Sequence, residues 1–360
     1  MRNIILVFVL SLCSFASHGQ LDEFLIGYYS QDYNNKDYVP SGTSQAIGND
    51  FALLQLIKDF GANYVHINYQ LFSPSEQYAA NSPSIYFLDN ASDLGLRVIL
   101  RCPDIYVKSN NPPYNPTTSI QGLNYYGNHP SIIGFDLRDE PNSAAFPIIN
   151  SYANDIRNFN GNFLRLSNLF PNYAPNESLF GTTGTPTYDD YSRYVQDYID
   201  ATNPNIISFD HYPIWQNQNN FFTNLDVFAK KSRLNDIPFI YVLTQIRSTA
   251  SLPYCYQTSV PKNIPEFNYV IFASLAYGAK GISYWHSTCK NDFFGVIPPD
   301  VMTYLGNLHS KFKKSSKTLL KLTFQSAYHK SENSTIFTGQ IEQIHPSSLW
   351  SLFSNDQFAK

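Results

Sequence analysis

Short apolar, β-branched segments alternate with helical segments eight times along this chain, between residues 24 and 322. The apolar runs are continuous rather than alternating, which is typical of parallel strands that are buried on both faces. Eight strand-and-helix units in succession predict an α/β fold, a (β/α)8 TIM barrel formed as a single domain. The main alternative, a doubly wound open sheet, usually carries a glycine-rich phosphate turn after its first strand. Residues 27–35 (GYYSQDYNN) contain no such turn.

The positions of the elements follow from the spacing of apolar residues, which recurs every three or four residues in a helix. Strands are predicted at residues 24–29, 63–68, 97–102, 132–137, 163–169, 206–210, 239–243 and 281–285. Helices are predicted at residues 47–60, 85–94, 119–126, 146–159, 188–202, 222–234, 266–279 and 301–322.

The two ends of the chain are predicted to lie outside the barrel. Residues 1–19 resemble a secretory signal peptide, with Arg2 ahead of a short apolar run and Ser17 and Gly19 as small residues before the cleavage site. The barrel is expected to occupy residues 20–323, followed by a short appendage at residues 324–360. We therefore expect a secreted, extracellular protein with no membrane-spanning segment.

Export permits disulfides, and three cysteines remain after residue 19. Cys255 and Cys289 both fall in predicted loops, so we propose them as a pair. Cys102 ends an apolar strand and is expected to be a buried free thiol.

The charge balance restricts the possible partners. Charged residues make up 14% of the chain and the formal net charge is −4, whereas soluble proteins usually contain roughly 25% charged residues. A nucleic-acid partner is not expected, because phosphate binding needs a concentrated cationic face. The 27 Tyr and 27 Phe residues, with many Asn, suit a surface for polyhydroxyl compounds, although compositional drift explains them equally well.

Polar side chains follow the predicted strands, at the end of the barrel where catalytic groups of this fold lie. Asp139 and Glu140 follow the fourth strand directly. Carboxylates and amides suit sugar hydroxyls, and aromatic faces suit the C–H faces of a pyranose ring. The rim therefore predicts an oligo- or polysaccharide substrate. Its predicted binding residues are Arg101, Asn168, Asp210, His211, Tyr212, Gln245 and Trp285.

Glu140 is the main catalytic candidate. A partly desolvated carboxyl at a barrel mouth can have its pKa raised until it donates a proton at neutral pH. The alternative is that Glu140 only stabilises the start of the helix that follows it. Asp139 is expected either to orient a substrate hydroxyl or acetamide, or to pair with Arg101 or Arg138. For His211, the alternative to a sugar contact is a satisfied rim histidine.

Residues 129–141 (HPSIIGFDLRDEP) resemble the fourth-strand segment of clan A glycoside hydrolases, the superfamily of β-galactosidases and cellulases. That pattern ends in Asn-Glu-Pro, with Asp139 here in place of the Asn, and the resemblance implies that Glu140 is the general acid/base. Residues 166–175 (LSNLFPNYAP), 207–214 (ISFDHYPI) and 272–285 (FASLAYGAKGISYW) resemble later segments of the same family.

The resemblance fails at one position, because the family's nucleophile is a Glu at the end of strand seven and Gln245 stands there. An amide cannot act as the carboxylate nucleophile of retaining hydrolysis. Three interpretations remain. Another carboxylate, Glu266, Asp210 or Asp104, supplies the second function, although Glu266 also reads as a first-turn acid of its own helix. In the second interpretation, the acetamido group of the substrate attacks its own anomeric carbon while Asp139 orients it. In the third, the barrel binds glycans without cleaving them.

No cofactor or metal is expected. His66, His211 and His286 lie at predicted strand ends, but no His-x-His or HExxH spacing supports a zinc site.

Overall fold

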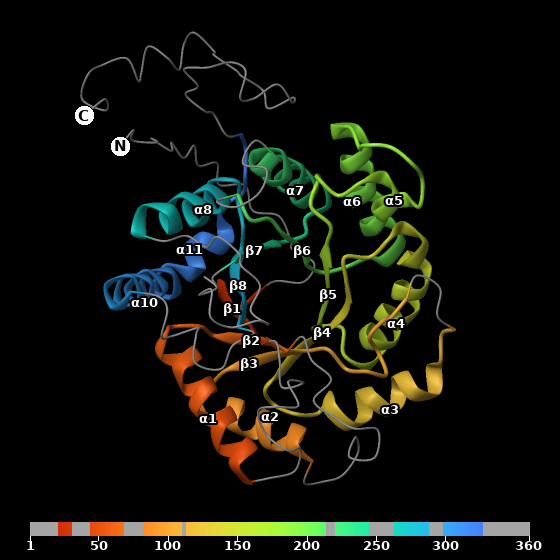
Figure 1. The fold of residues 1–360 in the computed structure, drawn as a ribbon. Helices are drawn as coiled ribbons and strands as arrows, with labels where there is room; N and C mark the ends of the chain where they lie inside the picture. Colours follow the sequence, from red (N-terminus) through yellow and green to blue (C-terminus); the bar gives the residue numbers. More distant parts are fainter. Residues whose placement is uncertain are drawn as a thin grey trace, which may run out of the picture.

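In the computed structural model, eight parallel strands close into a barrel in chain order, β1 to β8, surrounded by helices (Figure 1). The structure describes residues 21–30, 44–67, 82–109, 113–213, 220–244, 263–287 and 298–326, and the statements below concern these ranges. The barrel confirms the predicted (β/α)8 fold. Residues 1–19 and the proposed cysteine pair, Cys255 and Cys289, lie outside the described residues, so the signal peptide and the disulfide stay predictions.

The strands are β1 Leu25–Ser30, β2 Tyr64–Ile67, β3 Arg97–Leu100, β4 Ile132–Asp139, β5 Leu164–Leu169, β6 Ile207–Asp210, β7 Phe239–Thr244 and β8 Gly281–Ser287. The helices are α1 Ser44–Asp59, α2 Pro83–Asp93, α3 Pro116–Tyr126, η1 Ser143–Ala145, α4 Phe146–Phe159, α5 Asn176–Phe180, α6 Tyr188–Thr202, α7 Phe221–Asn235, α8 Ile264–Ala276, α10 Pro299–Lys314 and α11 Ser316–Lys321.

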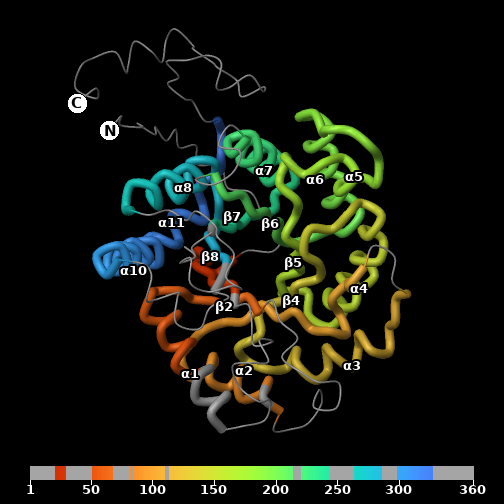
Figure 2. The backbone as a smooth tube through the Cα atoms, in the orientation of Figure 1, coloured from red at the N-terminus to blue at the C-terminus, as the bar shows by residue number. Residues whose placement is uncertain are grey.

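Figure 2 traces the chain once around the ring, from β1 to the last helices, so that the first and last units meet. Closure is direct, because β1 pairs in parallel with both β2 and β8. A sheet closed in this way has no free edge and all its C-terminal strand ends open at one mouth. Side chains from distant parts of the sequence are thereby brought to a single rim.

The core has two parts, one between the strands and the helices and one inside the barrel. On β3, Val98 and Leu100 belong to the larger outer cluster, whereas Ile99 belongs to the smaller inner one. This division explains why the strands read as unbroken apolar runs, since both faces of each strand are buried. Close packing inside the barrel also requires Gly27, because a Cβ atom there would lie 2.0 Å from the ring of Tyr64.

Several element bounds differ from the prediction in ways that have local causes. Strand β4 continues two residues beyond the predicted end, to Asp139, because its pairing with β5 extends to Asn168. The predicted helix at residues 301–322 is two helices, α10 and α11, separated at Ser315. The short helix α5 was not predicted. Helices α4 and α6 have the predicted bounds, and α6 begins with a capping box formed by Thr187 and Asp190.

Cys102 is buried and carries a free thiol, as predicted. Among the helices of the described ranges, none combines the length and apolar character needed to cross a membrane.

Candidate active site

The end of β4 holds Glu140 in an unusual backbone conformation. Its φ of 45° lies in the left-handed region, where a residue other than glycine costs about 1–3 kcal/mol. The two other non-glycine residues with positive φ in the described ranges, Asn203 and Asp236, both end helices, where this conformation is common. Glu140 instead continues the strand pairing, since its N–H donates to the carbonyl of Asn168 at 2.7 Å. Strain held by surrounding structure is typical of functional positions.

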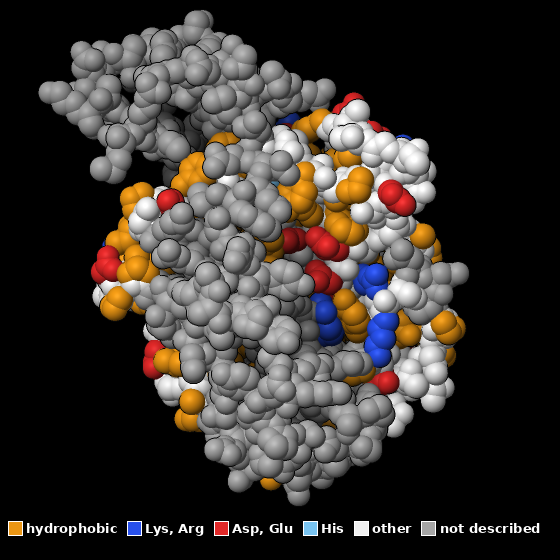
Figure 3. Space-filling view, viewed as in Figure 1, with side chains coloured by type: hydrophobic (Ala, Val, Ile, Leu, Met, Phe, Trp, Pro, Cys, Tyr) orange, Lys and Arg blue, Asp and Glu red, His pale blue; other side chains and the backbone are white. Residues whose placement is uncertain are grey.

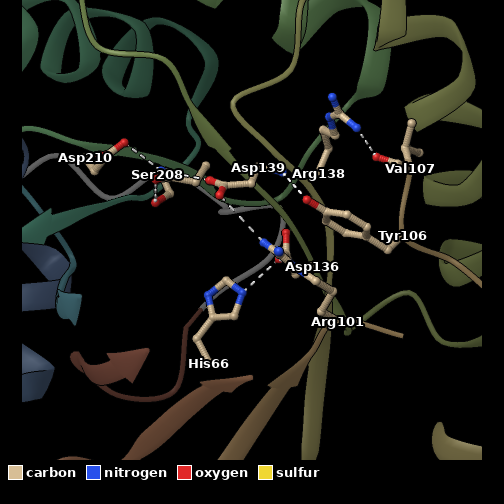
Figure 4. A network of polar contacts seen from close by, with 10 residues as sticks. His66, Arg101, Tyr106, Val107, Asp136, Arg138, Asp139, Ser208 and Asp210 are labelled. Atoms are coloured by element: carbon tan, nitrogen blue, oxygen red, sulfur yellow. Dashed lines mark hydrogen bonds and ion pairs between the residues drawn. The ribbon is translucent and has the colours of Figure 1, made fainter. Parts of the chain in front are cut away.

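Asn168, at the matching level of β5, connects the carboxylates of the two strands that flank β5. Its Nδ2 donates to Oδ1 of Asp210 at 2.8 Å and lies 3.5 Å from Oδ1 of Asp139. Its Oδ1 accepts from the hydroxyl of Ser208 at 2.9 Å, which fixes the orientation of the amide. Figure 4 shows Asp139, Ser208 and Asp210 converging in this way. The ends of β4, β5 and β6 therefore form one polar cluster.

Burial, together with the charges of nearby carboxylates, raises the pKa values of Glu140 and Asp210. Burial raises the pKa of Glu140 to about 9, and the charges of Asp210 and Asp139 add to the effect. Burial also raises the pKa of Asp210, to about 6, together with the charge of Asp139 and against hydrogen bonds from Tyr212 and Asn168. At neutral pH, Glu140 is therefore protonated while Asp210 is largely ionised.

Asp139 is a partly exposed member of the cluster. Its side chain is 42% exposed, and the protein around it still raises its pKa by desolvation, against the opposing charge of Arg101. Arg101 Nη2 lies 3.9 Å from Asp139 Oδ2, which agrees with one of the predicted pairings. The backbone N–H of Asp139 donates to the hydroxyl of Tyr106 at 3.2 Å. Asp139 can therefore accept hydrogen bonds from a ligand at the barrel mouth.

A buried network below the cluster holds Arg101 in place. Arg101 donates to Asp136 Oδ2 from both Nε and Nη2 at 2.7 Å, and its guanidinium lies 4.1 Å from the centre of the Tyr106 ring. His66 Nε2 lies 3.1 Å from the same Asp136 oxygen, and its ring lies 3.9 Å from that of Tyr29. Burial raises the pKa of Asp136, but Arg101 and His66 outweigh it and leave the pKa lowered. Asp136 thus remains a charged anchor inside the barrel.

On the other side of Asp210, two aromatic rings lie at the rim. Tyr212 and Trp285 are stacked, with ring centres 5.7 Å apart and planes inclined by 21°. Both are partly exposed, which suits the predicted contact with the face of a sugar ring.

His211 directly follows β6, but its side chain is not exposed at the rim. Its side chain is fully buried, with Nδ1 2.6 Å from Nδ2 of Asn224, and its carbonyl accepts from the hydroxyl of Tyr241 at 2.7 Å. This burial does not favour the predicted contact between His211 and a sugar hydroxyl. The contact with Asn224 agrees with the alternative interpretation of His211 as a satisfied rim histidine.

Glu266 lies in the first turn of α8, beside the residue that caps that helix, Asn263. Its N–H donates to Oδ1 of Asn263 at 3.0 Å, and Nδ2 of Asn263 donates to its carboxylate at 3.2 Å. Glu266 is not among the charges that act on Glu140. The geometry therefore favours the interpretation of Glu266 as a first-turn acid of its own helix over the catalytic one. Gln245 lies outside the described residues.

Figure 3 shows acidic side chains gathered near the middle of the face that carries the barrel mouth, with basic side chains beside them. Within the described part of the chain, no group of three or more His, Cys, Asp or Glu residues is arranged to hold a metal ion. Asp136 and Tyr106 are site residues that the sequence prediction missed. The available signal for Asp136 was a charged residue inside an otherwise apolar strand.

Comparison with known structures finds the same fold in several glycoside hydrolases. A Bacteroides thetaiotaomicron structure with a provisional alpha-L-fucosidase assignment aligns with a TM-score of 0.56 at 10% identity, covering 85% of this chain and 99% of its own. The endo-1,4-beta-mannanase of Rhizomucor miehei aligns with a TM-score of 0.51 at 13% identity, covering 83% and 99%. Bacteroides uniformis beta-glucuronidase 2 aligns with a TM-score of 0.53 at 14% identity over 80% of this chain.

This chain spans 35% of that glucuronidase but nearly all of the other two proteins. No family model matches the sequence, and no curated protein matches it. At these identities the likeness is one of fold. It agrees with the resemblance to clan A glycoside hydrolases that the fourth-strand motif indicates.

Proposed function

We propose that this chain is a secreted glycoside hydrolase that cleaves a glycosidic bond with Glu140 as the general acid. The observation that carries the proposal is the position of Glu140 at the end of β4, joined through Asn168 to Asp210, where burial and nearby carboxylates raise its pKa to about 9. Two carboxyl groups whose pKa values are pushed apart are the usual arrangement of a proton donor and its ionised partner. Secretion rests on the sequence of residues 1–19 alone.

The surroundings of Glu140 support a carbohydrate as the substrate. Asp139 and Arg101 offer a charged acceptor and charged donors at the mouth, and the stacked rings of Tyr212 and Trp285 offer an apolar face. Such a combination matches the alternating hydroxyl and C–H surfaces of a pyranose. A binding protein without turnover is the second candidate, favoured by Gln245 at the position where the family places its nucleophile.

The test is hydrolysis of a panel of 4-nitrophenyl glycosides, including an N-acetylglucosaminide, alongside binding of the matching free oligosaccharides. For the wild type we expect release of nitrophenol from at least one member. Glu140→Gln should keep oligosaccharide affinity, because the amide has nearly the shape of the protonated acid. It should lose turnover about 10²- to 10⁴-fold on a glycoside of the same sugar with an alcohol leaving group, and less on the nitrophenyl glycoside.

Glu23→Gln is the matched control, since Glu23 pairs with Arg97 at the opposite, N-terminal rim of the barrel. It should keep full turnover. Oligosaccharide binding without hydrolysis of any panel member by the wild type would support the glycan-binding alternative instead.

A further inference from the structure

We infer that Asp210 is the second catalytic carboxylate of this barrel, acting as the general base that activates the attacking water. The inference rests on the glycosidase function proposed above and names the group that replaces the missing strand-seven carboxylate. Gln245 cannot perform this step, because a neutral amide does not accept a proton at ordinary pH. Of the other candidates, Glu266 is bonded to the capping residue of its own helix, Asn263.

Hydrogen bonds connect Asp210 to Glu140 through Asn168. The N–H of Glu140 donates to the carbonyl of Asn168, and the side chain of Asn168 donates to Asp210. The three residues lie at the ends of β4, β5 and β6, which are neighbours in the barrel. Asp210 is also the strongest charged influence on Glu140. The charge of Asp210 therefore acts on the carboxyl of Glu140 at the barrel mouth.

The hydrogen bonds of Asp210 suit a base better than those of Asp139. Asn168 and Tyr212 both donate to Asp210, which keeps it ionised despite burial, with a pKa of about 6. A base poised near neutral pH is the most effective one. Asp139 instead lies 3.9 Å from Arg101, whose charge opposes the rise in pKa that burial causes. Asp139 is better suited to orienting the substrate.

The reaction balances with these two carboxyl groups and one water. The water oxygen bonds to the anomeric carbon as the bond from that carbon to the leaving oxygen breaks. One water proton passes to Asp210, and the proton of Glu140 passes to the leaving oxygen. Glu140 then ends ionised and Asp210 protonated, and proton exchange with solvent restores both. The net change is one water added across the glycosidic bond.

The proposed reaction itself gives the stereochemical outcome. Water attacks in a single displacement, with one carboxyl as acid and the other as base, which is the mechanism of inverting enzymes. We therefore expect inversion of configuration at the anomeric carbon.

The experiment uses the full chain and the 4-nitrophenyl glycoside that the wild type hydrolyses fastest. Asp210→Asn should lower kcat about 10²- to 10⁴-fold. Sodium azide should restore turnover, because azide attacks without needing a base, and it should give a glycosyl azide of inverted configuration. Asp226→Asn is the matched control. Asp226 is a buried aspartate bonded to Lys230 and Tyr188 outside the barrel, so this variant should keep its activity.

An Asp210→Asn variant with wild-type turnover would overturn the assignment while leaving the glycosidase proposal intact. An inactive wild type would overturn both. If Asp210→Asn does not fold, NMR of the first product released by the wild type decides the question. The opposite anomer from the substrate supports the assignment, and the same anomer refutes it.

Discussion

Replacement of Glu140 by Gln is expected to stabilise the fold at neutral pH while it removes turnover. The ordinary pKa of this carboxyl is 4.5, and in the folded chain it is raised to about 9. The folded state therefore binds a proton that the unfolded state has released throughout the interval between these values. Stability then falls as the pH rises through that interval, because the native state holds more protons than the unfolded state.

The magnitude follows from the distance between the working pH and the ordinary pKa. Each pKa unit corresponds to about 1.4 kcal/mol, and pH 7 lies about 2.5 units above the ordinary value. Release of this proton in the unfolded state therefore lowers the free energy of unfolding, relative to a Glu140 that stays protonated in both states. The loss is about 3 kcal/mol at pH 7 but only about 1 kcal/mol at pH 5. Gln, which resembles the protonated acid, avoids this loss.

The assay is urea unfolding of the wild type and Glu140→Gln at pH 5 and pH 7, followed by tryptophan fluorescence. The stability advantage of the variant should grow by about 2 kcal/mol between the two pH values. Glu23→Gln is the control, since Glu23 lies in a partly exposed ion pair with Arg97 and should show no such trend. An advantage of the same size at both pH values would refute the protonated state of Glu140.

Two further substitutions test the network around the cluster. Asp136→Asn should lower the free energy of unfolding by up to about 3 kcal/mol, because Arg101, whose side chain is only 15% exposed, loses its charged partner. Thermal unfolding measures this, and an unchanged Tm would contradict it. Asn168→Ala removes a donor to the ionised form of Asp210 and should raise its pKa by about 1–2 units. The acidic limb of the kcat/KM profile should then move to higher pH, and an unmoved or lowered limb would contradict the role of Asn168.

The barrel could be predicted because each unit repeats the same pattern. Continuous apolar runs mark strands buried on both faces, and helical spacing fixed α4 and α6 to the residue. The split of the last helix at Ser315 could not be predicted, since the helical pattern continues across it. The extension of β4 to Asp139 depends on pairing with β5, which is a contact between distant residues.

The site was predicted in part for a related reason. Strand ends identified Glu140, Asn168 and Asp210, because closure of the barrel brings such positions to one rim. His211 also follows a strand, but its side chain turns into the packing beside Asn224. That direction depends on local backbone geometry, which spacing does not specify. The left-handed conformation of Glu140 depends on pairing across strands and carries no local sequence signal.

The central claim, that Glu140 donates a proton to the leaving group, is tested most directly by the dependence of turnover on that group. Wild type and Glu140→Gln are compared on two glycosides of the same sugar, one with a nitrophenol leaving group and one with a simple alcohol. Nitrophenol leaves with little protonation, whereas an alcohol needs a proton donor. We predict a loss in the variant that is at least about tenfold larger for the alcohol glycoside. An equal loss on both substrates, or no loss on either, would contradict the account.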